Sequence, residues 1–273
     1  MKFVNILTKE ALEESYQELN SLKAVGKKFN VDPGTIKKYM QFYGLNFKSQ
    51  IRYSCDYDFF SRENEESFYL AGFIAADGCI KKRKNSSKNL RHDLQITLSM
   101  SDKKHLENIK NIIKSEHPIY NFLIKNSKRN LKWNDSWSSQ LTITSEKIVN
   151  DLEKFNITPK KSLTYKFPLW LVDHPLCNHF MRGYFDGDGC FCKRKRKNNY
   201  QLYFSLRGTS DFLQIYRSIL ERECNLKVRE KPIRVNSNIG ILEYGGNIIL
   251  GKITDYLYKD SKIFLDRKRD IIK

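Results

Sequence analysis

The sequence predicts an α+β fold made of two related halves, preceded by a small all-α module. The first observation is an internal repeat, in which "SFYLAGFIAADGCI" at 67–80 and "NHFMRGYFDGDGCF" at 178–191 align without a gap, 111 residues apart. The second is that the same order of strand-like and helix-like segments follows each stretch. The third is that residues 1–47 carry helical periodicity alone. Antiparallel hairpins with helices on one face are the economical packing for such halves.

The balance of charge indicates a polyanionic partner. The 273 residues hold 49 Lys and Arg against 31 Asp and Glu, a formal net charge of +18. This excess favours nucleic acid over an anionic membrane surface, and no apolar run approaches the roughly 18 residues that a spanning helix needs. The opening "MKFVNILTKEALEE" turns polar too soon for a signal peptide. The six cysteines form no paired Cys-x-x-Cys ligands, so we expect reduced thiols rather than structural zinc.

The first module, residues 1–47, resembles a helix-turn-helix. The stretch "SLKAVGKKFNVDPGTIKKYMQFYG" predicts two short helices around a tight turn, in which Asn30 tolerates a left-handed backbone. Asp32 caps the second helix and Pro33 takes its first position. In a helix-turn-helix this second helix enters the DNA major groove. We therefore expect DNA contacts from its exposed side chains, Thr35, Lys37 and Lys38. The alternative is a plain helical hairpin that packs on the rest of the chain.

Residues 48–66 show no periodicity and predict a linker, followed by a first repeat at 67–175 and a second at 176–273. Each repeat has the order helix, two strands, helix, two strands, helix. In the first, the segments after the opening helix are strands within 79–100, a helix from near Asp102, strands at 117–124 and 138–144, and a helix at 145–155. In the second, they are strands within 190–209, a helix from near Asp211, strands at 226–235 and 239–245, and a helix at 246–258.

Small residues line one stripe of each opening helix. Gly72, Ala75 and Ala76 fall at helical spacing in the first helix, as Gly183 and Gly187 do in the second. Small residues on one stripe let two helix backbones approach closely. We therefore expect the two opening helices to pack against each other, with their large apolar side chains directed into two separate cores.

The two opening helices end in aspartates at matching places, Asp77 and Asp188. A carboxylate at a helix C-terminus opposes the helix dipole, and two carboxylates held together raise each other's pKa. Stability alone does not favour this arrangement. Divalent cations reverse the argument, because hard cations bind carboxylate and carbonyl oxygen. Two metals beside two carboxylates can stabilise the attacking and leaving oxygens of a phosphodiester displacement. The alternative is a pair of ordinary Asp-Gly helix ends.

The stretches "LAGFIAADG" and "MRGYFDGDG" resemble the LAGLIDADG motif of homing endonucleases, over roughly residues 67–273. The resemblance is to the monomeric two-repeat type and implies a saddle of two antiparallel sheets, from a doubled αββαββα fold, straddling duplex DNA. It implies site-specific, Mg²⁺-dependent cleavage of both strands that leaves short 3′ overhangs. Mn²⁺ is expected to substitute for Mg²⁺, and Ca²⁺ to bind without supporting cleavage. The implied partner is a long, partly asymmetric double-stranded site, with no membrane and no obligate protein partner.

The resemblance also assigns site residues. The metal ligands fall on Asp77 and Asp188, with the main-chain carbonyls of Ala76 and Gly187. The first repeat has Ala75 where the second has Asp186, a position that we do not count against activity. The family places a basic residue near each metal, and the alignment of the two repeats pairs Lys161 with Lys262. The competing lysines are Lys160, Lys166 and Lys268.

Basic strands follow both acids and predict DNA contact. Residues 79–100 hold six Lys and Arg with one acid, and residues 190–209 hold six with none. Alternating strand residues can send one set of side chains to DNA and the other to the core. The alternatives are nuclear signals or solvated hairpin tips. The expected DNA-binding residues are Lys81, Lys82, Arg83, Lys84, Lys193, Arg194, Lys195, Arg196, Lys197 and Arg207.

Two further functions remain open at this level. Some transcription regulators join a helix-turn-helix to a non-cleaving form of this fold, and some relatives act as RNA-splicing maturases. Retention of both aspartates favours the endonuclease, because a pure binder has no reason to hold two carboxylates against phosphate. We expect an intron-encoded or free-standing protein in the cytoplasm or nucleoid of a bacterial or phage-infected host, or in an organelle.

Overall fold

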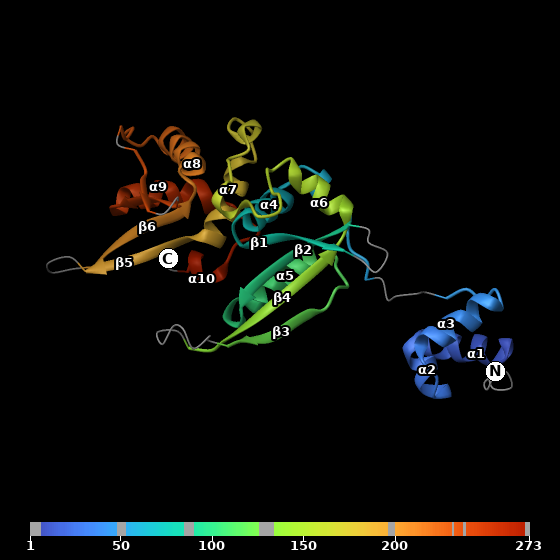
Figure 1. The fold of residues 1–273 in the computed structure, drawn as a ribbon. Helices are drawn as coiled ribbons and strands as arrows, with labels where there is room; N and C mark the ends of the chain where they lie inside the picture. Colours follow the sequence, from blue (N-terminus) through green and yellow to red (C-terminus); the bar gives the residue numbers. More distant parts are fainter. Residues whose placement is uncertain are drawn as a thin grey trace. The chain divides into compact units, whose positions relative to one another are not determined.

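The computed structural model describes residues 7–47, 53–84, 90–125, 134–195, 200–230, 232–236 and 239–270. The chain divides into two compact units, Met1–Tyr53 and Ser54–Lys273. Figure 1 shows both units as ribbons, and each is described by itself.

The first unit is a three-helix cluster of α1 (Lys9–Leu19), α2 (Leu22–Phe29) and α3 (Pro33–Phe42). Asn30 adopts the expected left-handed backbone, with φ 54°. The side chain of Asp32 accepts the Gly34 and Thr35 N–H groups at 2.7 and 3.3 Å, so the predicted cap of α3 is confirmed. Val25, Ile36 and Met40 are among the core residues of this unit. Helix α1 was not expected from the periodicity; its N-cap is Thr8.

The second unit contains the two repeats in the predicted order (Figure 1). The helices and strands of the first repeat are α4 (Glu65–Asp77), β1 (Gly78–Lys84), β2 (Leu90–Ser99), α5 (Lys103–Ile112), β3 (Ile119–Ile124), β4 (Ser136–Thr144) and α6 (Glu146–Glu153). Those of the second are α7 (Cys177–Asp188), β5 (Gly189–Lys195), β6 (Tyr200–Gly208), α8 (Ser210–Glu223), β7 (Arg234–Asn236), β8 (Ile239–Gly245), α9 (Asn247–Tyr258) and α10 (Asp266–Arg269). Single 3₁₀ turns occur at Phe59–Ser61, Met100–Asp102, Lys161–Leu163 and Leu169–Leu171.

Each repeat forms one four-stranded antiparallel sheet, in the orders β1-β2-β4-β3 and β5-β6-β8-β7. The fold class predicted from the sequence is therefore confirmed. Side chains alternate between the two sides of each sheet. In the first sheet the row Ile80, Leu94 and Ile143 is buried in the core. We call this the helix side, and the other, which carries Cys79, Gln95 and Thr142, the open side.

One predicted strand is much shorter than expected. The sequence indicated a strand at 226–235, but β7 covers only Arg234–Asn236. Pro232 has no backbone N–H to donate to a neighbouring strand. The backbone N–H of Arg229 donates to the side chain of Glu221 instead of to a strand, at 3.1 Å from Oε1. These two features keep Arg229 and Pro232 out of the sheet.

Helices α4 and α7 pack backbone to backbone between the sheets (Figure 1). A Cβ added to Gly72 would lie 2.0 Å from the Phe180 carbonyl oxygen, and one added to Gly183 would lie 1.9 Å from that of Tyr69. A third small residue, Gly187, faces Ala76 in the same way, at 2.3 Å. The predicted pairing of the two small stripes is therefore confirmed.

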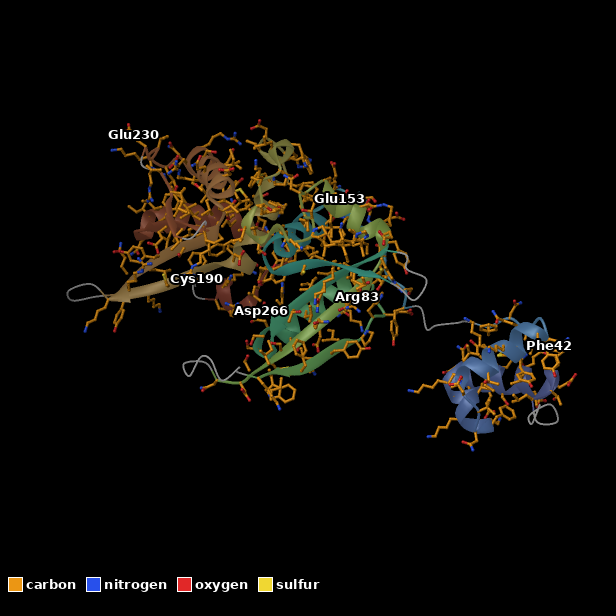
Figure 2. The ribbon with its side chains drawn as sticks, in the orientation of Figure 1. Phe42, Arg83, Glu153, Cys190, Glu230 and Asp266 are labelled. Carbon is orange, nitrogen blue, oxygen red and sulfur yellow. The ribbon has the colours of Figure 1, made fainter. Side chains whose placement is uncertain are left out.

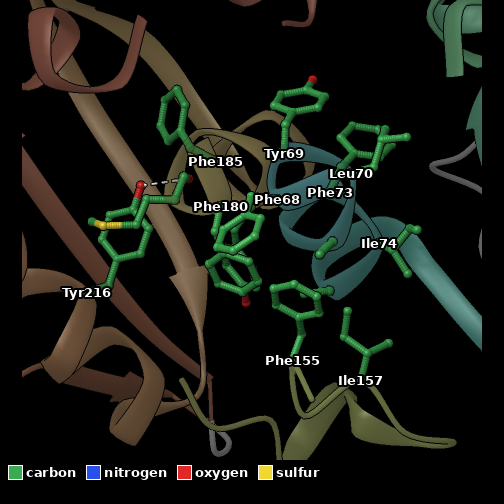
Figure 3. Packing of buried hydrophobic residues seen from close by; sticks show 14 of the residues in the cluster. Phe68, Tyr69, Leu70, Phe73, Ile74, Phe155, Ile157, Phe180, Phe185 and Tyr216 are labelled. Atoms are coloured by element: carbon green, nitrogen blue, oxygen red, sulfur yellow. Dashed lines mark hydrogen bonds between the residues drawn. The ribbon is translucent and has the colours of Figure 1, made fainter. Parts of the chain in front are cut away.

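The expectation of two separate cores was wrong. The buried apolar residues of both repeats form one cluster, which also contains Phe59 and Phe60 from the predicted linker. Figure 3 shows α4 and α7 side chains within this cluster. The Phe155 ring of the first repeat stacks on the Phe180 ring of the second at 5.9 Å. We call the contact between α4 and α7 the seam. Because the two helix backbones touch there, the aromatic side chains on either side of the seam can reach across it.

Candidate active site

The two predicted acids end the paired helices at neighbouring places. Asp77 is the last residue of α4 and Asp188 the last of α7. A Cβ added to Gly187 would lie 3.5 Å from the Asp77 carboxyl carbon, so Asp77 lies against the residue that precedes Asp188. The glycine contact that joins the helices thus also brings the two carboxylates to one end of the seam.

The surroundings of the two acids disfavour their negative charge. Burial among protein atoms, followed by the charge of Asp188, raises the pKa of Asp77 to about 6. Burial also raises the pKa of Asp188, while Lys161 and then Lys268 act to lower it. Protein atoms surround both carboxylates, but each residue still has surface exposed to solvent. That solvent screens part of the repulsion between the two negative charges. Without a cation, the site therefore holds two carboxylates whose ionisation is disfavoured.

Lys161 lies at the end of the first opening helix. Its side chain is buried, with 7% exposure, and Nζ donates to the carbonyl oxygen of Gly78 at 2.8 Å. Burial lowers the pKa of this ammonium, and the charges of Asp188 and Asp77 oppose that effect. The ammonium thus lies next to the residue that follows Asp77 and interacts with both acids.

Lys268 takes a comparable place at the end of the second helix. The side chain, in α10, has 2% exposure, and Nζ donates to the carbonyl oxygens of Phe185, Asp186 and Gly187 at 2.7, 2.5 and 3.3 Å. These carbonyls belong to the last turn of α7, where a cation complements the helix dipole. Burial lowers the pKa of Lys268 to about 8.

Lys262, which the alignment of the two repeats pairs with Lys161, lies elsewhere. Its side chain is exposed, and its backbone N–H donates to Glu65 Oε1 at 2.7 Å. Glu65 begins α4 and Asp77 ends it. At 1.5 Å per residue the two ends are about 18 Å apart. The other two competitors, Lys160 and Lys166, are also exposed.

Asp186 is a residue whose role the sequence did not indicate. It is fully buried, and its carboxylate accepts hydrogen bonds from Tyr69 at 2.8 Å, Tyr258 at 2.5 Å and the Leu265 N–H at 2.8 Å. Tyr69 belongs to the first repeat, so this carboxylate joins the two repeats. The bond to Leu265 fixes the segment that carries Lys268. The only signal in the sequence was an acid where the other repeat has alanine.

The strand register divides the basic residues between the two sides of each sheet. Lys81 and Arg83 pair with Asp93 and Arg91, so they lie on the open side, whereas Lys82 lies on the helix side. The Arg83 guanidinium forms a 2.8 Å ion pair with Asp93, whose side chain is buried. Figure 2 shows Arg83 on β1. Lys84 is the last residue of β1 and pairs with Leu90.

The second sheet follows the same rule. Arg194 and the exposed Arg207 lie on the open side, and Lys193 and Lys195 on the helix side. Arg194 pairs with Glu243 and lies over the ring of Tyr203. Two further predicted contacts, Arg196 and Lys197, fall outside the described residues. In the first unit Lys37 and Lys38 are exposed and Thr35 is partly buried.

A family model matches part of the chain. The family model described as "LAGLIDADG endonuclease" matches residues 70–168, which run from α4 past Lys161. The resemblance to the LAGLIDADG homing endonuclease family is confirmed over these residues. None of the curated proteins matches the chain.

Two solved LAGLIDADG structures share the fold of this chain. LAGLIDADG homing endonuclease I-GzeII in complex with its DNA target gives a TM-score of 0.50 at 17% identity, over 77% of this chain and 87% of that chain. I-SmaMI, bound to an uncleaved DNA target in the presence of calcium ions, gives 0.50 at 16% identity, over 77% and 89%. At these identities the likeness concerns the fold, and it extends to the second LAGLIDADG repeat, which the family model does not cover.

The LAGLIDADG helix ends offer a donor set that fits a divalent cation only in part. Two carboxylates with raised pKa values and the carbonyl groups beside them are hard oxygen donors. Within the described ranges, no group of three or more His, Cys, Asp or Glu side chains could hold a metal ion. Mg²⁺ is commonly bound through one or two carboxylates plus substrate phosphates. The residues therefore fit a cation whose remaining ligands come from water and nucleic acid.

No helix among the described residues is both long and apolar enough to span a membrane.

Proposed function

We propose that this chain is a site-specific endonuclease that hydrolyses both strands of duplex DNA with a divalent metal and leaves short 3′ overhangs. The observation that carries the proposal is the contact of Gly187 with Ala76 and Asp77, which brings the carboxylates of two repeats to one seam. One scissile phosphate per strand requires two sets of ligands close together. A seam between two pseudo-symmetric repeats supplies them.

In the proposed site, Asp77 and Asp188 hold Mg²⁺, together with the carbonyl groups of Ala76 and Gly187. Mn²⁺ substitutes for it, and Ca²⁺ binds without supporting cleavage. The bound metal supplies Lewis-acid stabilisation of the attacking and leaving oxygens. In the apo chain the pKa of Asp77 is raised to about 6, so metal binding displaces a proton from a fraction of the molecules near neutral pH.

The two buried lysines are proposed to act on the phosphate and its water. Lys161 and Lys268 each lie at the end of one opening helix, which supports one role per strand. An ammonium there stabilises the negative charge that develops on the phosphate oxygens. With a pKa lowered to about 8, Lys268 can also exchange a proton with the attacking water. We assign this role to Lys268 in place of Lys262, whose backbone contacts the far end of α4.

The open sides of the two sheets are proposed to face the DNA. Lys81, Arg83, Arg194 and Arg207 lie there by register and can reach base edges. The helix-side lysines of the hairpins, with Arg196 and Lys197, are proposed to contact phosphates.

The first unit, through Thr35, Lys37 and Lys38, is proposed to extend the footprint, with 48–66 as its linker. The functional species is a monomer, because both acids come from one chain.

A cleavage experiment tests this proposal. The protein is incubated with Mg²⁺ and a randomised duplex library, and the ends of the products are sequenced. We expect recurrent double-strand breaks at one long, partly asymmetric site, with 3′ overhangs. Sequence-specific retention of DNA without any cutting would instead support a DNA-binding regulator. Retention of intron RNA, with DNA ignored, would support a splicing maturase.

A further inference from the structure

The edge strand of the first sheet carries an exposed apolar row. Tyr120, Phe122 and Ile124 of β3 are 59%, 37% and 47% exposed. Exposed large apolar side chains in a row indicate a contact surface rather than a solvated edge. These residues play no part in the proposed metal site.

The strand register places this row on the open side. Tyr120 pairs with Gln140 and Phe122 with Ser138. Gln140 in turn pairs with Thr97, next to the row of core residues Ile96 and Leu141 on the other side. The apolar row therefore shares its side of the sheet with Lys81 and Arg83.

The second sheet has different residues at the equivalent positions. Tyr120 pairs with the residue before Leu141, and Arg234 pairs with the residue before Leu242. Leu141 and Leu242 occupy matching places in the two sheets. Each pairs with a residue of the neighbouring strand, β2 or β6, and that residue pairs with the glycine that follows Asp77 or Asp188. By the same step Phe122 matches Asn236. The aromatic residues of β3 are therefore not repeated in the sequence of β7.

The apolar row of β3 has a direct consequence for reading bases. In the major groove, arginine pairs with guanine and asparagine with adenine, while apolar side chains contact the 5-methyl group of thymine. A row of three apolar side chains has no donor for guanine except the Tyr120 hydroxyl. It gains free energy by covering methyl groups.

We propose that β3 reads thymine methyl groups, so that the half-site under the first repeat carries thymines where Tyr120, Phe122 and Ile124 meet it. The proposal rests on the proposed function, because it takes duplex DNA as the occupant of the open side. Two observations favour DNA over a protein partner: the row shares its side of the sheet with Lys81 and Arg83, and the chain carries a net charge of +18. The apolar row is thus a specificity element within an otherwise basic interface.

The test removes the methyl group and the side chain separately. Duplexes are selected from a randomised library by the full chain in Ca²⁺, and single thymines of the selected site are replaced by uracil, which lacks only the methyl group. For the wild type, uracil at the β3 positions should weaken binding about 4-fold per methyl, the value of one buried carbon. Phe122→Ser and Tyr120→Ser should each lose the uracil effect at the thymine that the missing side chain covers, and keep it at the others. Leu123→Ser is the matched control, because Leu123 is 36% exposed on the same strand but on the helix side; it should keep the wild-type sensitivity.

The outcomes separate this inference from the proposed function. If no duplex is selected at all, DNA binding fails and the reading of β3 fails with it. If a site is selected but uracil has no effect anywhere in the first half-site, only the reading of β3 is overturned. It is also overturned if the wild type forms a dimer in sedimentation that Phe122→Ser abolishes while the selected sequence stays the same, because a second copy would then cover the row.

Discussion

The ammonium of Lys268 donates to the carbonyl oxygen of Phe185 at 2.7 Å, within the last turn of the helix that ends in Asp188. A buried lysine at this place offsets both the dipole of α7 and the charge of the acid. It also has little freedom to move, because two more carbonyls accept from the same Nζ. The lysine is therefore held in position before any substrate arrives.

The two candidate lysines of the second repeat should differ sharply in effect. Lys268→Met removes the charge but keeps the length of the side chain, and we expect cleavage to fall about 100-fold, the size of one lost electrostatic contact to a transition state. Lys262→Met, at an exposed position, is the control and should stay near the wild-type rate. Single-turnover plasmid cleavage measures both. Equal losses in the two variants would remove the basis for choosing Lys268.

The close contact of the opening helices should make their glycines irreplaceable. A Cβ at Gly183 would lie 1.9 Å from a backbone oxygen that cannot rotate away, so Gly183→Ala should lower the free energy of unfolding by about 3 kcal/mol. Gly251, inside α9, has nothing within 4 Å of an added Cβ. Gly251→Ala should therefore raise the free energy of unfolding by about 1 kcal/mol through helix propensity. Urea unfolding of both variants checks the contrast, and similar losses would show that the seam is looser than described.

The raised pKa of Asp77 predicts how the metal-free protein responds to pH. The folded pKa, about 6, exceeds the ordinary value of 3.8, so the folded state binds this proton more tightly than the unfolded state does. The resulting destabilisation is complete above pH 6 and disappears as the pH falls towards 3.8. In EDTA at pH 7.5, Asp77→Asn should therefore be more stable than the wild type, by about 1 kcal/mol after solvent screening. The difference should shrink at pH 5, and a constant or reversed difference in urea unfolding would contradict this account.

The first unit should add affinity without chemistry. Replacing Lys37 and Lys38 with alanine removes two exposed charges from α3, and we expect footprinting to show lost protection at one end of the site. Replacing Lys9 and Lys23 changes the net charge equally and should leave the footprint length unchanged. Cleavage at saturating protein should persist in both variants. Loss of cutting in the Lys37 and Lys38 variant at saturation would give the first unit a role in catalysis.

The sequence was sufficient for features that depend on spacing and small residues. The matching glycines and aspartates predicted that two helices meet and where they end, because only small residues permit that approach. The position of Lys268 could not be predicted from the spacing of residues in the sequence. The segment between α9 and α10 is irregular, and its path is set by contacts such as the hydrogen bond from Leu265 to Asp186. The shared core was missed for a similar reason. Whether Phe155 and Phe180 point apart or together depends on the helix crossing, which periodicity does not contain.

The central claim is that Asp77 and Asp188 meet in order to hold metal against phosphate. Its most direct test compares Asp77→Asn and Asp188→Asn with the wild type, by plasmid cleavage in Mg²⁺ beside gel-shift binding in Ca²⁺. We expect each variant to lose double-strand cleavage while binding to the selected duplex survives, because the open sides of the sheets are unchanged. If both variants cut at the wild-type rate, the two carboxylates are only helix ends and the proposed mechanism is wrong.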